Sequence, residues 1–349
     1  MKKAHFLRQT ILAVITLLMA FWLSTRVGAR EITDMYGRKF VISDYPRKVF
    51  SASPPVTWLL YTIDPTMLTG LNFPIKENDR KYLYRCASDL PVIGGWFGQA
   101  YTPNLEMLLK IKPEVVAVSI NHSALSAKIC STMKTMGMPV LNVPVYALAD
   151  YPNAYATVGR ILGREARSRK LGRYCSKTLH EAAMVTAGIP DKRRVSVYYA
   201  EGADGLSTEC DSSWHSELIT LAGGKNVHQC RAGDNYGMEK VSMEQVLLYN
   251  PDVILAFDRT FYRRVFHDAK WRRIRAVRNR KVFFIPDQPT NWFDRPPSFM
   301  RFIGLKWVLN LLYPRDYKID IVKEASDFYR FFLGVEVSEG DMRRIITGE

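Results

Sequence analysis

The sequence predicts an α/β protein of two Rossmann-like lobes, each with a mainly parallel sheet, joined by one long rigid helix and enclosing a ligand cleft between the lobes. Short β-rich runs alternate with amphipathic helices, the alternation restarts after residue 191, and a helical segment without strands lies between the two halves. The 349 residues allow about two domains. With 47% hydrophobic residues the chain can bury substantial cores, so a mostly disordered protein is excluded.

Residues 1–29 have the pattern of a cleaved secretory signal peptide. Lys2, Lys3 and Arg8 precede an apolar run over residues 11–23, and small residues follow at 27–29. The apolar run is short for a bilayer, which needs about 20 residues, although an uncleaved anchor is the alternative. No cysteine follows the cleavage site, which argues against a lipoprotein anchor. We therefore expect an exported protein.

The N-terminal lobe is expected to span residues 30–163 and to alternate strands with helices. A proline in the first helical turn and a glycine after the last mark the helix ends. Expected strands are 48–52, 67–71, 115–119 and 140–143, and expected helices are 54–63, 104–111 and 123–137.

The connecting helix is expected over residues 164–187, where apolar residues recur at helical spacing, and would span about 36 Å. Such a stiff connector predicts small lobe motions. The C-terminal lobe, 188–349, has a helical C-terminal extension that Phe328, Phe331 and Phe332 should pack onto a lobe. Its expected strands are 195–200, 253–257 and 282–285, and its expected helices are 214–222, 242–248 and 297–312.

An internal repeat supports two equivalent lobes. Residues 104–119 align without gaps on residues 242–257, and each segment starts with a helix-capping residue. Glu106 and Glu244 follow at the same offset, and then come an apolar helix, a proline, an acidic residue and a buried strand. This shared order indicates that the two lobes are structurally equivalent.

The net charge of +15 is concentrated in residues 263–281, which carry nine basic side chains and one acidic side chain. A basic patch can attract nucleic acid or anionic lipid. An exported protein meets little nucleic acid, and apolar residues between the basic ones resemble the buried face of a helix. We therefore interpret this segment as a solvated helix face and expect no nucleic-acid partner.

The candidate ligand-binding residues follow the expected strands, because open α/β sheets bind ligands outside the carboxyl ends of their strands. Trp96 lies in a glycine-rich loop and Trp214 beside His215, and Ser53 precedes a helix whose N-terminus favours anions. The candidates are Ser53, Trp96, Asn121, His122, Tyr146, Glu201, Trp214, Asp258, Arg259, Trp292 and Arg295, with His122 and His215 as possible metal ligands.

Several of these residues have a structural alternative. Tyr146 and Trp292 could be packing residues, and Arg295 could form a salt bridge with Asp294 that holds its loop. Cys210 and Cys230 could pair in an oxidising compartment. The other cysteines, Cys86, Cys130 and Cys175, lie in different elements and leave the connectivity open.

The sequence lacks the GxSxG, HExxH, GxxxxGK[ST] and GxGxxG motifs of common enzyme classes. We expect a binding protein without catalytic residues. One alternative is an exported chelatase-like enzyme of similar architecture, in which His122 and Glu201 would be catalytic. Another is a sensory ligand-binding domain, which would not need the paired Glu106 and Glu244.

The chain resembles the periplasmic substrate-binding proteins that deliver iron–siderophores, haem, cobalamin or metal ions to ABC importers. The resemblance rests on residues 47–53, 104–119, 221–226 and 241–252. Residues 291–297, 304–307 and 312–314 are similar to a subgroup associated with metals and metal chelates. The resemblance implies a periplasmic, monomeric binding protein with no cofactor of its own.

The resemblance also implies partners. In similar importers one glutamate on each lobe docks into an arginine pocket of the permease dimer. Glu106 and Glu244 hold the matching positions in this sequence. The alternative is that these two glutamates only complement the dipoles of their helices. Trp96, Tyr146, Trp292 and Arg259 suit a planar chelate. His122, His215, Glu201 and Asp258 could instead coordinate a metal ion directly. The positive charge favours an anionic complex, either a chelate or an oxyanion, with iron as the expected metal.

Overall fold

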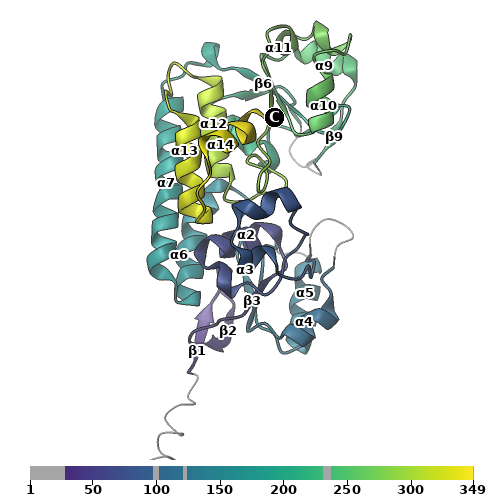
Figure 1. Ribbon diagram of the computed structural model, residues 1–349. Coiled ribbons are helices and arrows are strands. Elements are labelled where there is room, and N and C mark those ends of the chain that lie inside the picture. Colours follow the sequence, from purple (N-terminus) through teal and green to yellow (C-terminus); the bar gives the residue numbers. More distant parts are fainter. Residues whose placement is uncertain (1–27, 97–101, 121–123, 231–236, 349) are drawn as a thin grey trace, which may run out of the picture.

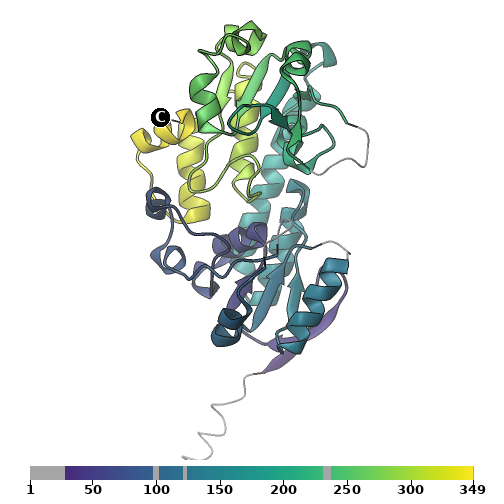
Figure 2. The same ribbon diagram turned by 90° about the vertical axis from the view of Figure 1, so that its right-hand side faces the viewer.

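The computed structural model describes residues 28–96, 102–120, 124–230 and 237–348. Two α/β lobes lie one above the other, and the long helix α7 (Glu165–Ala187) runs along one side of both (Figures 1 and 2). The expected fold class is confirmed. No helix within these described ranges combines the length and the apolar character needed to cross a bilayer.

The N-terminal lobe is built on a three-stranded parallel sheet of order β3-β4-β5. Its strands are β3 (Val49–Ser51), β4 (Val115–Val118) and β5 (Val140–Asn142), and the first two are entirely buried. An antiparallel hairpin, β1 (Ala29–Thr33) and β2 (Lys39–Ser43), lies at its outer end. The helices are α2 (Pro54–Ile63), α3 (Arg85–Ser88), α4 (Leu105–Ile111), α5 (Ala124–Thr135) and α6 (Tyr151–Leu162).

The C-terminal lobe is built on a four-stranded parallel sheet of order β11-β10-β6-β8. Its strands are β6 (Ser196–Ala200), β8 (Lys225–Asn226), β10 (Val253–Ala256) and β11 (Val282–Phe284), and β7 (Ser207–Thr208) pairs antiparallel with β9 (Glu239–Lys240). The helices are α8 (Glu217–Leu221), α9 (Met243–Tyr249), α10 (Arg259–Arg264), α11 (Arg275–Arg278), α12 (Arg301–Leu312), α13 (Ile321–Phe328) and α14 (Glu339–Thr347).

The internal repeat of the sequence is also a structural repeat. In α4 and α9 the N-cap side chains of Asn104 and Ser242 each accept a hydrogen bond from the backbone three residues later. Both helices have seven residues and end at a left-handed residue, Lys112 (φ 51°) or Asn250 (φ 38°). Helix α4 then leads into β4, and α9 leads into β10. Each of these strands is second in the strand order of its lobe's parallel sheet.

Helix α7 packs closely against α6 because small residues line their contact. A Cβ on Gly159 would lie 2.4 Å from the Ser168 hydroxyl, and one on Gly172 would lie 3.3 Å from the Pro152 carbonyl oxygen. Close backbone approach therefore explains the glycine inside the long helix, which would otherwise cost about 1 kcal/mol.

The C-terminal extension contacts both lobes and α7, rather than packing onto one lobe. Phe328, Phe331 and Phe332 surround Tyr174 of α7, with ring centroids 5.1–5.7 Å from it. The carbonyl oxygen of Leu333 accepts a hydrogen bond of 3.2 Å from the Tyr61 hydroxyl in the N-terminal lobe. The extension is thus a second link between the lobes, beside α7 (Figure 1).

Two expected elements differ in the structure. Residues 67–71 form no strand: after a 3₁₀ turn, Leu68 makes an isolated bridge to Val49 at the start of β3, and Leu71 makes another to Val92. The basic stretch does not form one helix either. It divides into α10, a 3₁₀ turn and α11, while Val265, Trp271, Ile274 and Val277 are buried as expected.

Candidate functional site

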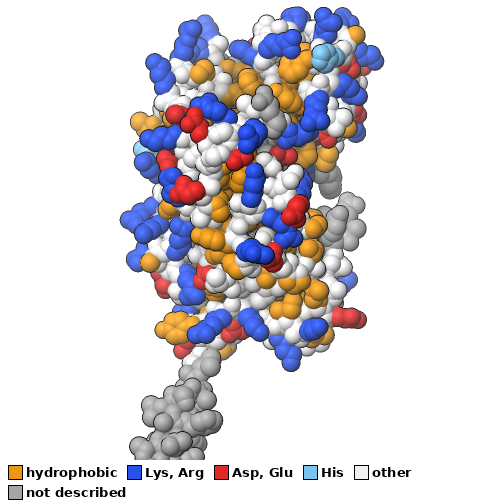
Figure 3. All heavy atoms as spheres, viewed as in Figure 1, with side chains coloured by type: hydrophobic (Ala, Val, Ile, Leu, Met, Phe, Trp, Pro, Cys, Tyr) orange, Lys and Arg blue, Asp and Glu red, His pale blue; other side chains and the backbone are white. Residues whose placement is uncertain are grey.

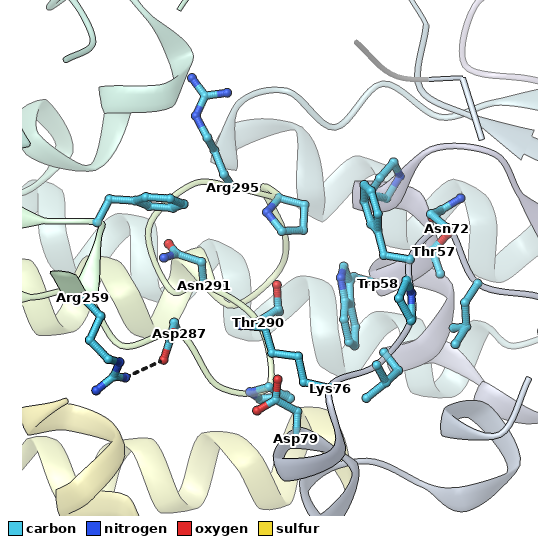
Figure 4. Close-up of a pocket in the computed structure, with 18 of the residues that line it drawn as sticks. Thr57, Trp58, Asn72, Lys76, Asp79, Arg259, Asp287, Thr290, Asn291 and Arg295 are labelled. Carbon is cyan, nitrogen blue, oxygen red and sulfur yellow. Dashed lines mark hydrogen bonds and ion pairs between the residues drawn. The ribbon is translucent and has the colours of Figure 1, made fainter. Parts of the chain in front are cut away.

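A cavity of about 500 Å³ lies between the lobes at the carboxyl ends of the strands. Figure 4 shows Thr57, Trp58 and Asn72 on one side, with Arg259, Asp287 and Asn291 facing them from the other lobe. The lining residues are Pro54, Thr57, Trp58, Leu71, Asn72, Phe73, Pro74, Ile75, Lys76, Asp79, Phe257, Asp258, Arg259, Phe284, Asp287, Pro289, Thr290, Asn291, Arg295 and Pro296.

The N-terminal wall comes from α2 and the segment after it. Strand β3 ends at Ser51 and α2 begins at Pro54, so the side chains of Thr57 and Trp58 face the cavity from the first turns of the helix. The Thr57 hydroxyl donates a hydrogen bond of 2.6 Å to Asn72, and the Asn72 amide donates to the carbonyl oxygens of Ser51 and Gly94. This network holds the loop over the end of β3.

The C-terminal wall comes from the ends of β10 and β11. The guanidinium of Arg259 pairs with Asp287 at 3.3 Å, lies over the Phe284 ring at 4.2 Å and donates to the carbonyl oxygen of Gly348. The backbone of Gly348, just after α14, therefore helps to hold the Arg259 side chain in place. A neighbouring cavity of about 420 Å³ shares Arg259 and continues to Arg344 of α14.

The charges on the cavity wall balance. Lys76, Arg259 and Arg295 are matched in number by Asp79, Asp258 and Asp287. The Asp79 carboxylate accepts a hydrogen bond of 3.0 Å from the Gln288 amide across the lobes, and burial raises its pKa despite that bond. The overall positive charge of the chain is thus not concentrated on the described part of this cavity.

Three of the expected ligand-binding residues line the cavity: Asp258, Arg259 and Arg295. The Asp258 carboxylate, however, accepts hydrogen bonds from the backbone of Thr260 and Phe261 and caps α10. In Figure 4 the Arg295 side chain points away from the other labelled residues, because its guanidinium pairs with carboxylates deeper in the lobe. The contacts of Arg295 in the structure are therefore salt bridges, as in the structural alternative.

Trp292 corrects an expectation, since it is fully buried and not part of the cavity lining. Its indole nitrogen lies 3.2 Å from the Tyr329 hydroxyl and 3.3 Å from the Gln288 carbonyl oxygen. Both are partners inside the core, one of them in the C-terminal extension. The packing alternative therefore holds for this tryptophan.

The other candidates lie around the cleft but outside the cavity lining. Ser53 is buried, and its hydroxyl accepts a hydrogen bond of 2.9 Å from the backbone of Ser119. Trp96 is half-buried and packs against a hydrophobic cluster of the N-terminal lobe. Tyr146 meets Trp214 across the lobes, with ring centroids 6.2 Å apart. Asn121 and His122 lie outside the described residues.

Glu201 belongs to a buried charged cluster behind Arg295. Its Oε1 lies 2.9 Å from Arg295 Nε, and the same guanidinium pairs with Glu209 and Asp294. Burial, together with the neighbouring carboxylates, raises the pKa of Glu201 to about 7 although Arg295 opposes the shift. His215 completes the cluster, with Nδ1 2.5 Å from Asp294 Oδ1 and its ring centroid 3.6 Å from that of Trp214 at a tilt of 31°.

Sequence reasoning missed Trp58 and Glu209. Trp58 lies in the helix expected over residues 54–63, for which the sequence gives no ligand-binding residue, although its position just after the Ser-Pro-Pro turn that follows β3 is a usable signal. Glu209 follows the two-residue strand β7, which has no recognisable pattern. In the same region Cys210 and Cys230 form a disulfide, while Cys86, Cys130 and Cys175 are free.

Two α/β lobes that enclose a cavity at their strand ends and share a long connecting helix define a solute-binding protein. Residues 96–289 match the family model described as periplasmic binding protein, and the chain belongs to this family, whose members bind solutes for ABC transporters.

Known relatives agree with this assignment. An ABC transporter solute binding protein from Sulfurospirillum deleyianum is 37% identical, with a TM-score of 0.84 over 92% of this chain and 99% of that one. The molybdate-binding protein MolA of Haemophilus influenzae is 24% identical over 87% of this chain and 90% of its own. The vitamin B12 binding protein BtuF of Vibrio cholerae has the same fold, with a TM-score of 0.60 and 18% identity over 78% of this chain and 99% of that one.

Proposed function

We propose that the chain is exported to the periplasm, binds a metal chelate in the cavity between its lobes and delivers it to an ABC permease. The cavity supports this proposal through its volume and through the aromatic residues that line it. A volume of about 500 Å³ suits a drug-sized ligand and far exceeds the needs of a small ion. Trp58 and Phe73 from one lobe and Phe257 and Phe284 from the other provide aromatic surface for a chelator.

The balanced wall charges also favour a chelate over a bare ion. A free oxyanion needs an excess of donors or positive charge, whereas Asp79, Asp258 and Asp287 offset the three basic residues of the described wall. A chelator distributes the charge of its metal over a larger apolar surface. Lys76 and Arg259 would then contact peripheral oxygens of the ligand, and iron is the metal that the sequence analysis favours.

Docking to the permease would use Glu106 and Glu244. Both side chains are exposed in the first turns of α4 and α9, which lie at the outer ends of the two lobes on the face away from α7 (Figures 1 and 2). Leu105, Leu109 and Leu248 on the same helices are also exposed. An acidic residue beside exposed leucines on each lobe suits two matching pockets on a dimeric permease.

An oxyanion is the second candidate cargo, and the likeness to MolA of Haemophilus influenzae favours it. The chelatase alternative has lost support, because its acid, Glu201, is fully buried and paired with Arg295. A buried, paired carboxylate is poorly placed to receive protons from a substrate.

The test is to purify the chain from the periplasm of its native host, identify bound compounds by native mass spectrometry and metal analysis, and titrate stripped protein. The titrants are ferric catecholate and hydroxamate siderophores, haem, cobalamin and molybdate. We expect one chelate at 1:1 stoichiometry, and Trp58→Ala should weaken its binding by about 10- to 100-fold. Tyr45→Ala is the control, since Tyr45 is 73% exposed and outside the cavity. Binding of molybdate alone would overturn the chelate proposal.

A further inference from the structure

One cluster in the C-terminal lobe buries three carboxyl groups around one guanidinium. Glu201, Glu209 and Asp294 have fully buried side chains, and all three face the single guanidinium of Arg295. Glu201 Oε2 and Asp294 Oδ2 are buried without a hydrogen-bond partner in the part of the chain that the structure describes. Carboxylates removed from water in this way are costly unless a cation or donor completes their surroundings.

Three side chains of this cluster converge from separate segments. Glu209 follows β7, His215 lies in the turn Trp214–Ser216 before α8, and Asp294 lies in the loop after β11. Ligand atoms of the three lie within 4.8 Å of one another. Gly237 has φ +75°, and a Cβ there would lie 2.9 Å from Glu209 Oε1, so the backbone closes tightly over the cluster.

We propose that Glu209, His215 and Asp294 bind one divalent transition-metal ion. Two carboxylate oxygens and an imidazole nitrogen are a donor set that suits Co²⁺, Ni²⁺, Zn²⁺ or Cu²⁺, whereas Mg²⁺ and Ca²⁺ prefer oxygen alone. The carboxylates of the cluster compensate the charge of the ion, and the His215 side chain, which is 15% exposed, lies beside the Trp214–Tyr146 contact between the lobes.

Arg295 acts as the cation of this cluster in the metal-free protein. Its guanidinium pairs with Glu209 and Asp294, two of the three proposed ligands. It also lies 2.9 Å from Glu201 Oε1, which is outside the ligand set, so it keeps a carboxylate partner when the ion displaces it. Arg295 also lines the cavity, and its displacement would therefore change the cavity wall.

This assignment goes beyond the proposed function, because it concerns a metal ion without a chelator. The experiment titrates the chain, stripped with a chelating agent, with Co²⁺ and Ni²⁺ alone, following heat and the visible absorption of Co²⁺. We expect one ion per chain. Glu209→Gln and His215→Gln should weaken binding at least about 100-fold, and Arg295→Gln should tighten it about tenfold by removing the competing cation.

His228→Gln is the matched control. His228 also lies in the C-terminal lobe, is 12% exposed, and pairs with a carboxylate, Glu239, at 2.9 Å. Its removal should leave Co²⁺ affinity unchanged. Loss of binding in His228→Gln but not in His215→Gln would overturn the assignment, as would an absence of Co²⁺ and Ni²⁺ binding at millimolar concentration.

If the two ligand variants fail to fold, the wild-type protein still decides the question. Imidazole NMR signals of His215 should then shift or broaden with Co²⁺ while those of His180 and His267 do not. Unchanged His215 signals would contradict the site. The experiment distinguishes failure of the metal site from failure of the proposed cargo. Co²⁺ binding to this cluster and chelate binding to the cavity are measured separately, so either can fail while the other succeeds.

Discussion

Arg301 in α12 donates a hydrogen bond of 2.9 Å from Nη1 to the carbonyl oxygen of Tyr146 in the N-terminal lobe. Its Nη2 reaches the carbonyl oxygen of Trp214 at 3.0 Å and the carboxylate of Glu217 at 2.5 Å. The carboxylate of Glu217 in turn accepts from the backbone of Leu148. One fully buried guanidinium therefore joins both lobes.

Replacing Arg301 should destabilise the protein strongly. Arg301→Met removes the cation beside the Glu217 carboxylate and the donor to two backbone carbonyl oxygens, those of Tyr146 and Trp214, at a cost of about 3–5 kcal/mol. Guanidinium chloride unfolding measures this free energy. Arg343→Met is the control, because its pair with Glu339 is 62% and 69% exposed, and it should change stability by at most about 0.5 kcal/mol. Equal effects of the two variants would contradict the lobe-joining role.

Gly304 and Gly340 should respond oppositely to alanine, although both lie in helices. A Cβ on Gly304 would lie 1.8 Å from the carbonyl oxygen of Trp292, whereas one on Gly340 would meet only the end of Arg344 at 3.9 Å. Gly304→Ala should therefore cost at least about 1–3 kcal/mol. Gly340→Ala should gain about 0.4–1 kcal/mol by restricting the unfolded chain. Thermal unfolding followed by circular dichroism measures both, and a Gly304→Ala protein as stable as wild type would refute the close packing.

The acidic residues of the repeat, Glu114 and Asp252, should make stability depend on acid pH. The Asp252 carboxylate accepts from the backbone of Ser196 and pairs with Arg275 at 2.6 Å, and Glu114 accepts from the backbone of Lys48. Partial burial raises the pKa of each carboxyl, but these hydrogen bonds outweigh it, so both pKa values are lowered.

Because the folded-state pKa lies below the unfolded one, each carboxylate contributes its full stabilisation above the unfolded pKa, about 4. That contribution is lost as pH falls through the folded-state pKa. Asp252→Asn should lower stability by about 1–3 kcal/mol at pH 7 and flatten the decline between pH 5 and 2. Urea unfolding across this range measures the effect, with the exposed Glu77→Gln as the control. A wild-type decline no steeper than that of Asp252→Asn would argue against the linkage.

Removing the two repeat glutamates should abolish transport without affecting cargo binding. Glu106→Ala with Glu244→Ala should lower uptake in the native host at least about tenfold, since under the proposed docking each substitution would remove one charged contact with the permease. The control is Glu165→Ala with Glu339→Ala, which removes two first-turn glutamates of α7 and α14. Uptake that survives the first pair, or falls equally with the second, would disprove the docking assignment.

Local signals predicted the regular elements well. Helix α2 begins and ends at the expected residues, and the caps at Asn104 and Ser242 lie where the repeat indicated. These features depend on interactions within a few residues, which a sequence displays directly. The strand expected at residues 67–71 is absent because Leu68 and Leu71 bridge to two different partners, Val49 and Val92, and so form no continuous ladder.

The site was less accessible from sequence. The positions of Arg259 and Arg295 after strands identify them in the sequence, but their partners, Gly348 and Glu209, come from a helix end and from the segment after a two-residue strand. Trp292 occupies the core instead of the cleft because the C-terminal extension supplies Tyr329 as a partner for its indole. Neither partnership leaves a periodic pattern in the sequence.

The sequence by itself determined the two parallel sheets, the long helix and the paired Glu106 and Glu244, because alternation, caps and an internal repeat are local properties. Only the tertiary structure decided that Glu201, Glu209 and Asp294 share one guanidinium and that Arg301 joins the lobes. Such long-range pairings depend on which side chains the packed lobes bring within a few ångströms, and that is set by the arrangement of the whole chain.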